Sequence, residues 1–380
     1  YAVIDLDAIA HNVRALAAHA SPVSEFFAVV KSNAYGHGAR QVAEVALQNG
    51  ATRLAVGRVD EAIQLRDAGI EAPILIMCYT VPAEAELIAE HRLMATISSI
   101  ESAEALSGRA TALGTTVRVH VKVDTGMGRY GVLPDEVLPF LNSVAALPAL
   151  EIEGIFTHFA TADERDKSYT YRQFNLFKEV LQAVREAGYT IPLRHAANSA
   201  ATLDLPETHL DAIRPGIAIY GMYPSSEVSH SLELRPALTL RSHVARVRTL
   251  PPGYSISYGR TYTTHRPTPV ALIPVGYGDG YHRALSNKGY VLIRGRRAPI
   301  VGRVCMDQFV VDISGIEGVR ENDDVVLLGG QGEERITAEE IAALAGTINY
   351  EVTTSLLQRI PRVFLRDGEV VDVLRLTTCC

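Results

Sequence analysis

Lys31 is the first side chain of the sequence that could take part in covalent chemistry. It follows the apolar run 26–30 and precedes a polar, glycine-containing loop at 32–38. At the end of a buried strand an amine is partly desolvated, which lowers its pKa and favours the neutral form that attacks a carbonyl to give a Schiff base. A solvated lysine at the rim of the fold is the plainer interpretation, and Lys31 alone does not decide between the two.

Other reactive side chains also follow apolar runs. They lie in the segments 122–129, 157–159, 198–199 and 214–216. Because the carboxyl ends of parallel strands in a barrel share one rim, folding would gather these groups around Lys31. The alternative is that these residues are ordinary polar side chains of surface loops and form no shared site, because loops are polar in any protein.

Two of these strand ends suit a phosphate group. Ser199 offers a hydroxyl, and Gly216 with Ile217 offers backbone N–H groups that a ligand can approach closely. Barrel enzymes often hold a phosphate between the loops that follow the seventh and eighth strands. A simple strand bulge at 214–216 is the alternative.

The pattern of the first part of the chain predicts the elements that position these groups. From residue 24 to about residue 220, short runs rich in Val, Ile and Leu alternate with longer segments of helical periodicity, which is typical of repeated βα units. The eight runs are 26–30, 54–57, 74–77, 94–97, 117–123, 152–159, 193–196 and 213–220. Short strands that are apolar on both faces predict an α/β fold with a closed (β/α)8 TIM barrel, and an open doubly wound sheet is the structural alternative.

The pattern changes after Pro236. Segments that read as antiparallel strands follow at 243–247, 270–274, 290–293, 309–313 and 324–328. Turn signals at 251–253 and 329–332 separate them, and a capping box at Thr337 predicts one late helix.

We therefore expect two domains, a barrel over 1–236 and a mainly β domain over 237–380. The strand-like residues 1–4 precede a helix at 7–19 and could join either domain.

Composition narrows the classes of partner and compartment. The 380 residues carry a net charge of -7, which argues against a nucleic-acid partner. The sequence contains no apolar stretch of about 18 residues, so no membrane partner is predicted. The cysteines are too few for a disulfide scaffold and lack zinc-ligand spacing, which favours a reducing cytoplasm and no metal site. These cysteines are Cys78, Cys305, Cys379 and Cys380. Because the chain starts at Tyr1 rather than at Met, the sequence leaves open whether a leader or transmembrane segment preceded it.

Seven short motifs follow one another along the chain. They are 30–38 (VKSNAYGHG), 122–129, 213–216, 257–259, 276–280, 305–307 and 349–351. In this order they resemble motifs of alanine racemases, and the first resembles the cofactor-lysine motif of that family. The lysine motif alone is shared with barrel decarboxylases and small pyridoxal-phosphate-binding proteins, whereas seven motifs across both domains are specific.

The resemblance implies a fold, a cofactor and an assembly. The family combines a barrel with a β domain and forms a head-to-tail homodimer in which each active site borrows residues from the partner's β domain. Its cofactor is pyridoxal 5'-phosphate. Its activity is the interconversion of L- and D-alanine, which supplies D-alanine for cell-wall peptidoglycan.

The resemblance also implies the two bases of the reaction. Lys31 would hold the cofactor and serve the D-alanine face, and Tyr258 of the partner chain would serve the L face. Since the unperturbed pKa of tyrosine is about 10, Tyr258 needs neighbours that stabilise its phenolate, and His158 and Arg214 would form that chain. Arg214 would also face the pyridine nitrogen of the cofactor.

Arg129 resembles the residue that contacts the phenolic oxygen of the cofactor and the substrate carboxylate, assisted by the backbone amide of Met306 from the partner. Lys122 resembles a lysine that is often carbamylated in this family, which would place an anion beside Arg129. An unmodified Lys122 that pairs with Asp124 is the alternative.

The remaining implied residues fall into two groups. Those that would bind the cofactor, mainly its phosphate, are Tyr35, Asn198, Ser199, Gly216, Ile217 and Tyr350. Tyr277 and Asp307 from the partner would lie at the substrate entrance, with structural hydrogen bonding as the alternative role for each.

Three other functions share some of these features. A serine-preferring or broad-spectrum racemase would differ in pocket size, and Tyr350 with Met306 suggests a small pocket suited to alanine. A non-catalytic pyridoxal-phosphate carrier would share the Lys31 motif but lack the second domain and the Tyr258 motif. A barrel decarboxylase would not be expected to combine 257–259 with 305–307.

Overall fold

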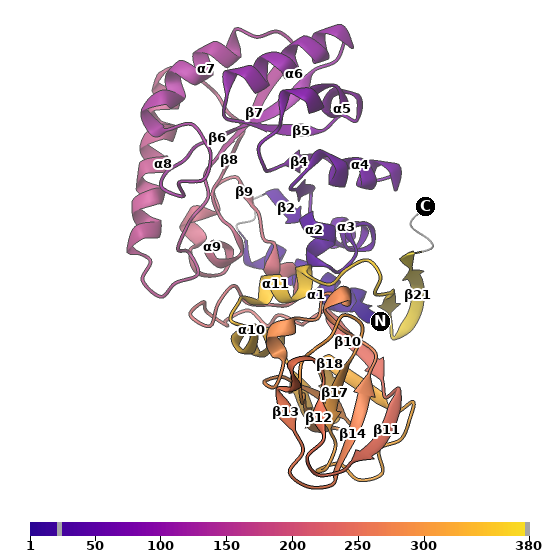
Figure 1. Ribbon diagram of the computed structural model, residues 1–380. Coiled ribbons are helices and arrows are strands. Elements are labelled where there is room, and N and C mark those ends of the chain that lie inside the picture. The colour runs from indigo at the N-terminus through magenta and orange to yellow at the C-terminus, as the bar shows by residue number, and fades with distance from the viewer. Residues whose placement is uncertain (21–24, 377–380) are drawn as a thin grey trace. The chain divides into compact units, whose positions relative to one another are not determined.

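The structure, a computed structural model, describes residues 1–20 and 25–376 (Figure 1). Residues 21–24 and 377–380, and with them Cys379 and Cys380, lie outside this part of the chain. The chain divides into two compact units. The barrel unit comprises residues 8–34 and 39–236, and the β unit comprises residues 1–7, 35–38 and the chain from 237 onward.

Eight parallel strands close the barrel, as the sequence predicts. They are β2 (Glu25–Val29), β3 (Arg53–Val56), β4 (Ile74–Ile76), β5 (Met94–Ile97), β6 (Val117–Lys122), β7 (Leu150–Phe156), β8 (Leu193–His195) and β9 (Ala212–Ile213). Closure is completed where β9 pairs with β2, with Glu25 opposite Ala212 and Phe26 opposite Ile213. An open sheet would leave these two strands unpaired at its edges, so the doubly wound alternative is wrong.

The helices between these strands lie on the outside of the barrel (Figure 1). They are α3 (Ala39–Gln48), α4 (Val59–Asp67), α5 (Ala85–Glu90), α6 (Ile100–Ala112), α7 (Val137–Ala145), α8 (Ser168–Glu186) and α9 (Ser199–Asp204). Each buries an apolar stripe, and in α8 the buried Phe174, Phe177, Val180 and Val184 recur at helical spacing. No helix in the described ranges is both long and apolar enough to cross a membrane.

The last barrel strand is shorter than the predicted run 213–220. After β9 the chain turns, and Ile217–Tyr220 forms a 3-10 helix, η4. Pro215 has no N–H to give a neighbouring strand, and the N–H of Gly216 is bound to the Ser199 hydroxyl. Ladder pairing therefore stops where the predicted phosphate site begins.

The β unit is built from two sheets and a small hairpin. The large sheet contains β1 (Ala2–Asp5), β10 (Leu238–His243), β15 (Tyr290–Ile293), β16 (Arg296–Pro299), β18 (Asp324–Gln331), β19 (Glu334–Ile336), β20 (Arg362–Arg366) and β21 (Glu369–Leu374). The second sheet contains β11 (Arg246–Leu250), β14 (Thr268–Ile273) and β17 (Phe309–Asp312), and the hairpin pairs β12 (Ser255–Ile256) with β13 (Tyr262–Thr263). Strand β1 lies antiparallel to β10 and parallel to β20, so residues 1–4 join the β unit, and the predicted helix at 7–19 is confirmed as α1 (Leu6–His19).

Two predictions in this unit are wrong. The residues 243–247 do not form one strand as predicted, because the chain leaves the large sheet at His243 and enters the second sheet at Arg246. The predicted turn at 329–332 is mostly strand, since Gly329 pairs with Ile336 across the β18–β19 ladder. Glycines in that segment allow close packing, and a Cβ on Gly329 would lie 2.7 Å from Thr239.

The late helix is confirmed as α10 (Ala338–Ala345). Its N-cap Thr337 accepts a hydrogen bond from the backbone of Glu340 at 3.2 Å. The helix α11 (Asn349–Thr354) was not predicted from the sequence. It has six residues, too few to show a helical period in the pattern of apolar residues.

Candidate active site

One rim of the barrel carries the predicted reactive side chains of the barrel unit. Lys31 follows β2, Lys122 ends β6, His158 follows β7 and Arg214 follows β9. All of these positions are at carboxyl ends of parallel strands, so they share one rim. At the end of β3, a Cβ on Gly57 would lie 3.7 Å from the Cβ of Lys31.

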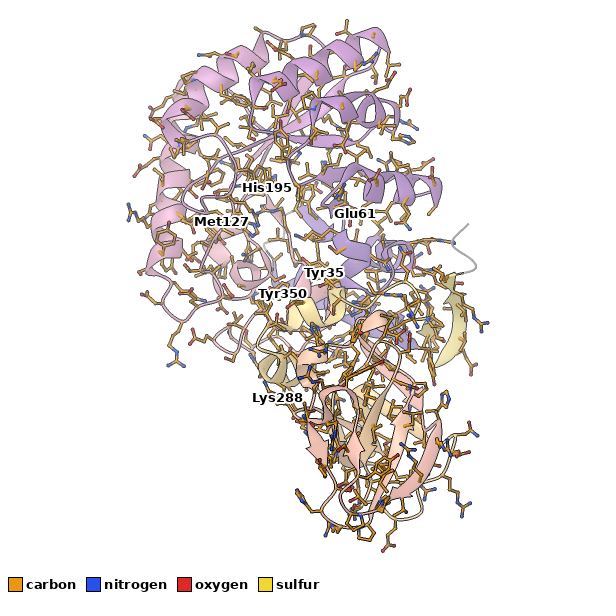
Figure 2. The ribbon with its side chains drawn as sticks, in the orientation of Figure 1. Tyr35, Glu61, Met127, His195, Lys288 and Tyr350 are labelled. Atoms are coloured by element: carbon orange, nitrogen blue, oxygen red, sulfur yellow. The ribbon has the colours of Figure 1, made fainter. Side chains whose placement is uncertain are left out.

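The backbone after Lys31 adopts a left-handed turn. Residues 32–35 all have φ of 52° or 53°. Residues with a Cβ pay roughly 1–2 kcal/mol each in this region, so contacts must hold the turn. The Glu61 side chain from α4 (Figure 2) supplies them: one carboxylate oxygen accepts from Ser32 N, and the other accepts from Gly57 N at 2.8 Å. Glu61 was not among the predicted site residues, because only the fold brings it to this loop.

Lys122 is almost completely buried, with 2% of its surface exposed. Burial, and then the positive charge of Arg214, lower the pKa of its amine to about 7. Its Nζ donates to the carbonyl of Val123 at 2.8 Å, and within the described residues it forms no ion pair. Asp124, the alternative partner, uses its carboxylate to accept from the backbone of residues 126–129.

His158 lies at a point where positive charges converge. Desolvation, and then the charges of Arg214, Lys122, Arg129 and Lys31, hold the pKa of its imidazole well below the usual value. The ring is therefore neutral at physiological pH. Four basic side chains around one neutral imidazole make a rim that favours anionic groups such as a phosphate or a carboxylate.

Arg214 is 3% exposed, and both terminal nitrogens of its guanidinium are hydrogen bonded to residues of the barrel. Its Nη1 donates to His195 Nδ1 at 2.7 Å, and its Nη2 donates to the carbonyls of Thr157 and Ala196 at 2.9 and 3.1 Å. Burial lowers the pKa of the guanidinium to about 10, so it stays protonated at neutral pH.

The histidine bonded to Arg214 is thus His195, whose ring lies among the barrel strands (Figure 2). The role of His158 and Arg214 in stabilising the phenolate of Tyr258 stays a prediction. The signal for His195 was weak: a polar residue within the short apolar run 193–196.

The predicted phosphate-binding groups of the barrel unit come together. The Ser199 hydroxyl accepts from Gly216 N at 2.8 Å and from Ala218 N at 3.4 Å, so the start of α9 meets the start of η4. Asn198 caps α9 by accepting from Ala201 N at 3.0 Å. Ile217 is the first residue of η4.

The predicted residues of the β unit lie on joined surface loops. Tyr258, Met306 and Tyr277 are 74%, 53% and 41% exposed, which is unusual for large apolar side chains. The Tyr277 backbone donates to the carbonyl of Cys305 at 3.0 Å, next to Met306.

Arg359 ties these loops together by ion pairs with Asp279 at 2.9 Å and with Asp307 at 2.8 Å. Asp307 therefore has an ion-pair partner within its own chain.

Tyr35 and Tyr350 are neighbours within the β unit (Figure 2). Their ring centroids are 6.1 Å apart. The segment 35–38 is held there by Arg362, whose Nε donates to the Gly36 carbonyl at 3.0 Å.

Comparisons with known proteins agree with this arrangement. The family profile described as "Alanine racemase, N-terminal domain" matches residues 4–224, and the one described as "Alanine racemase, C-terminal domain" matches residues 237–364. The chain belongs to the alanine racemase family. Alanine racemases of Desulfosudis oleivorans and Clostridium perfringens are 48% and 46% identical to it, over 96% and 98% of this chain and 96% and 97% of theirs.

Solved alanine racemases also share the fold. The enzyme from Bacillus anthracis with bound L-Ala-P is 42% identical, with a TM-score of 0.95 over 99% of this chain and 97% of that chain. An alanine racemase from Clostridium difficile is 40% identical, with a TM-score of 0.94 over 99% of this chain and 98% of that chain. The activity is thus that of an isomerase that racemises alanine, and these relatives do not favour the serine racemase or carrier alternatives.

Proposed function

We propose that this alanine racemase binds pyridoxal 5'-phosphate at the carboxyl rim of its barrel. We further propose that it moves the Cα proton of alanine between Lys31 and Tyr258 of a partner chain. The observation that carries the proposal is that Lys31, Lys122 and Arg214 all stand at carboxyl ends of barrel strands. Lys122 Nζ and Arg214 Cζ lie 5.5 and 5.2 Å from the centroid of the same Phe156 ring. A cofactor phosphate and an amino-acid carboxylate are the anions that such a rim would take.

The residues present fit the cofactor. Ser199, Gly216 and Ile217 would hold the phosphate, because the Ser199 hydroxyl lies at the start of η4, where it contacts the backbone N–H of Gly216. Asn198 would support this loop as the cap of α9. The family resemblance assigns the phosphate also to Tyr35 and Tyr350, which are neighbours in the β unit. When bound, the cofactor supplies an aldehyde for amines and a conjugated ring that delocalises the electrons of the substrate Cα–H bond.

Two bases are needed because racemisation removes the proton from one face of Cα and returns it to the other. Lys31, held by the left-handed turn that follows it, would accept or donate the proton on the D-alanine face. Tyr258 of the partner would do so on the L-alanine face. His158 is kept neutral by burial and by the surrounding cations, so one of its ring nitrogens would accept a hydrogen bond and the other would donate. The donor nitrogen is the one that could stabilise the phenolate of the partner's Tyr258.

Arg214 would face the pyridine nitrogen as a permanent donor, since its guanidinium stays protonated. Arg129 and the backbone amide of the partner's Met306 would bind the substrate carboxylate. Tyr277 of the partner would narrow the entrance to this site.

Lys122 suits carbamylation. An amine with a pKa of about 7 has a substantial neutral fraction at physiological pH, and the neutral amine is the form that adds to carbon dioxide, releasing one proton. The product is an anion, which would offset the positive charges of Arg129 and Arg214 beside it.

A homodimer with shared sites would account for the exposure of Tyr258 and Met306 on the β unit. The free thiols of Cys78 and Cys305 suit a reducing cytoplasm.

The test is racemisation in deuterated water. The wild-type enzyme, supplied with the cofactor, should convert L-alanine to D-alanine that carries deuterium at Cα. Tyr258→Phe should lose at least about 100-fold in rate from L-alanine while keeping Cα exchange on D-alanine, because the Lys31 face remains. Tyr254→Phe, at another exposed tyrosine of the β unit, is the matched control.

Full activity of Tyr258→Phe would overturn the assignment of the L face. Borohydride treatment of the loaded enzyme, followed by peptide mass spectrometry, should place the cofactor mass on Lys31. A cofactor mass on any other lysine would overturn that assignment.

A further inference from the structure

A line of buried polar side chains runs through the barrel from Arg214. Arg214 Nη1 lies 2.7 Å from His195 Nδ1, His195 Nε2 lies 2.8 Å from His120 Nδ1, and His120 Nε2 lies 3.0 Å from Glu153 Oε2. Both histidines are completely buried, and Glu153 is 7% exposed. Barrel interiors are normally filled by branched aliphatic side chains, so a continuous polar line needs a reason.

The far end of this line is a fixed carboxylate. Glu153 Oε1 accepts from Arg118 Nη1 at 2.9 Å and from Arg53 Nη1 at 3.1 Å. Desolvation acts to raise the pKa of Glu153, but the hydrogen bond from His120 and the charges of both arginines lower it to about 2. Glu153 is therefore ionised at any working pH and can only accept hydrogen bonds.

The two ends dictate the direction of every bond between them. Arg214 can only donate and Glu153 can only accept. A neutral imidazole has one donor and one acceptor nitrogen, so His195 must accept at Nδ1 and donate at Nε2, and His120 must do the same. A second proton on either ring would set two N–H groups against each other at His195 Nδ1 or at His120 Nδ1.

Packing, and hydrogen bonds at both ring nitrogens, oppose a flip of either imidazole. His195 is stacked between Phe156, at a centroid distance of 4.7 Å, and Phe27, at 5.3 Å. His120 is fitted against Gly154, where a Cβ would overlap the imidazole. The donor and acceptor roles along these hydrogen bonds therefore change when the tautomers of the two imidazoles change.

We propose that Glu153 is a positioning residue of this racemase. Its carboxylate fixes the tautomers of His120 and His195, so that His195 presents a lone pair to Arg214 and holds the guanidinium at the rim. The inference rests on the proposed function, in which Arg214 faces the cofactor. Glu153 touches neither cofactor nor substrate in that scheme and acts only through the two imidazoles.

The first test reads the tautomers in the cofactor-free protein. Nitrogen-15 NMR of histidine-labelled, deuterated protein should show both rings as Nε2–H tautomers at neutral pH. A coupling across the hydrogen bond between His195 Nε2 and His120 Nδ1 would assign the pair. An Nδ1–H tautomer or a doubly protonated ring at His195 would overturn the proposal, whether or not the protein racemises alanine.

The second test reverses the donor and acceptor roles of the two imidazoles. In Glu153→Gln, the two arginines require the amide oxygen, which turns the amide NH2 toward His120 Nε2 and favours Nδ1–H in both rings. An N–H would then face Arg214, and we expect kcat to fall about 10-fold with KM for alanine changed less than about twofold. Glu153→Asp keeps an acceptor and should keep the wild-type tautomers and most of kcat.

Glu151→Gln, at an exposed carboxylate of the same strand, is the matched control and should change neither tautomers nor kcat. Wild-type kcat with inverted tautomers, or a fall in kcat with tautomers unchanged, would overturn the positioning role. If Glu153→Gln does not fold, the wild-type spectrum and Glu153→Asp decide.

Discussion

The carboxylate of Asp124 accepts a hydrogen bond from the backbone N–H of Arg129 at 3.2 Å. Arg129 N–H is bound to Oδ2 of Asp124, and Oδ1 accepts from the backbone N–H groups of Gly126, Met127 and Gly128 at 2.9, 2.9 and 3.1 Å. Desolvation acts to raise the pKa of Asp124, but these N–H groups and the charge of Lys122 lower it overall. One carboxylate therefore shapes the whole loop that presents the Arg129 side chain.

Asp124→Asn should loosen that loop. The amide oxygen can keep the bonds to residues 126–128, but the NH2 group then faces the N–H of Arg129. We expect KM for alanine to rise about 10-fold, equivalent to about 1.4 kcal/mol, with a smaller change in kcat. Steady-state kinetics measure this, and Asp135→Asn, at an exposed carboxylate of the short 3-10 helix Pro134–Glu136, is the control. An unchanged KM would show that Arg129 is not positioned by Asp124.

The buried amine of Lys122 predicts a dependence of stability on pH. Burial lowers its pKa in the folded state to about 7, whereas the value without burial is 10.5. Between these values the unfolded chain binds the extra proton, so the Lys122 contribution to the free energy of unfolding should rise with pH from about 7 to about 10.5.

Denaturant titrations of carbonate-free protein at several pH values test this dependence. Lys122→Met should flatten the profile relative to wild type. Identical profiles for the two proteins would contradict the low pKa. Isotopically labelled bicarbonate should add one carboxyl mass to wild type but not to Lys122→Met.

Ser199→Ala should weaken cofactor binding. In the proposed site the Ser199 hydroxyl donates to the phosphate, and a hydrogen bond to a charged group contributes about 1.5–3 kcal/mol. We expect a rise of at least about 10-fold in the dissociation constant of pyridoxal phosphate, measured by equilibrium titration. Ser143→Ala, at an exposed helical serine, is the control. Equal cofactor affinity in the two variants would argue against the phosphate site.

Gly276 is expected to tolerate no side chain. A Cβ there would overlap the carbonyl oxygens of Cys305 and Met306, so Gly276→Ala must displace the Met306 loop. We expect a loss of stability of about 1–3 kcal/mol and a higher KM for alanine. Gly315→Ala, where a Cβ meets nothing within 4 Å, should change neither. Thermal unfolding and kinetics of both variants decide.

Local patterns of the sequence predicted most of the architecture. Buried parallel strands are apolar on both faces, so the eight barrel strands stand out, and Thr337 with Glu340 marks the start of α10. The error at 213–220 arose because Pro215 and Gly216 end the strand although the residues after them are still apolar.

The site was predicted less completely than the fold. Lys31 and Arg214 could be placed at the rim, because strand ends are visible in the sequence. Glu61 and Glu153 were missed, because a carboxylate acquires its role only through hydrogen bonds to residues distant in the chain. The exposure of Tyr258 likewise is accounted for only by the assembly proposed above.

Complementation between two inactive variants tests the shared site most directly. Lys31→Ala and Tyr258→Phe chains, expressed together, should form mixed dimers in which one site carries both changes and the other carries neither. About half of randomly assembled dimers are mixed and each has one intact site, so about one quarter of wild-type activity should return. If both catalytic residues of a site came from the same chain, every site would keep one defect, and activity no higher than that of the separate variants would contradict the account.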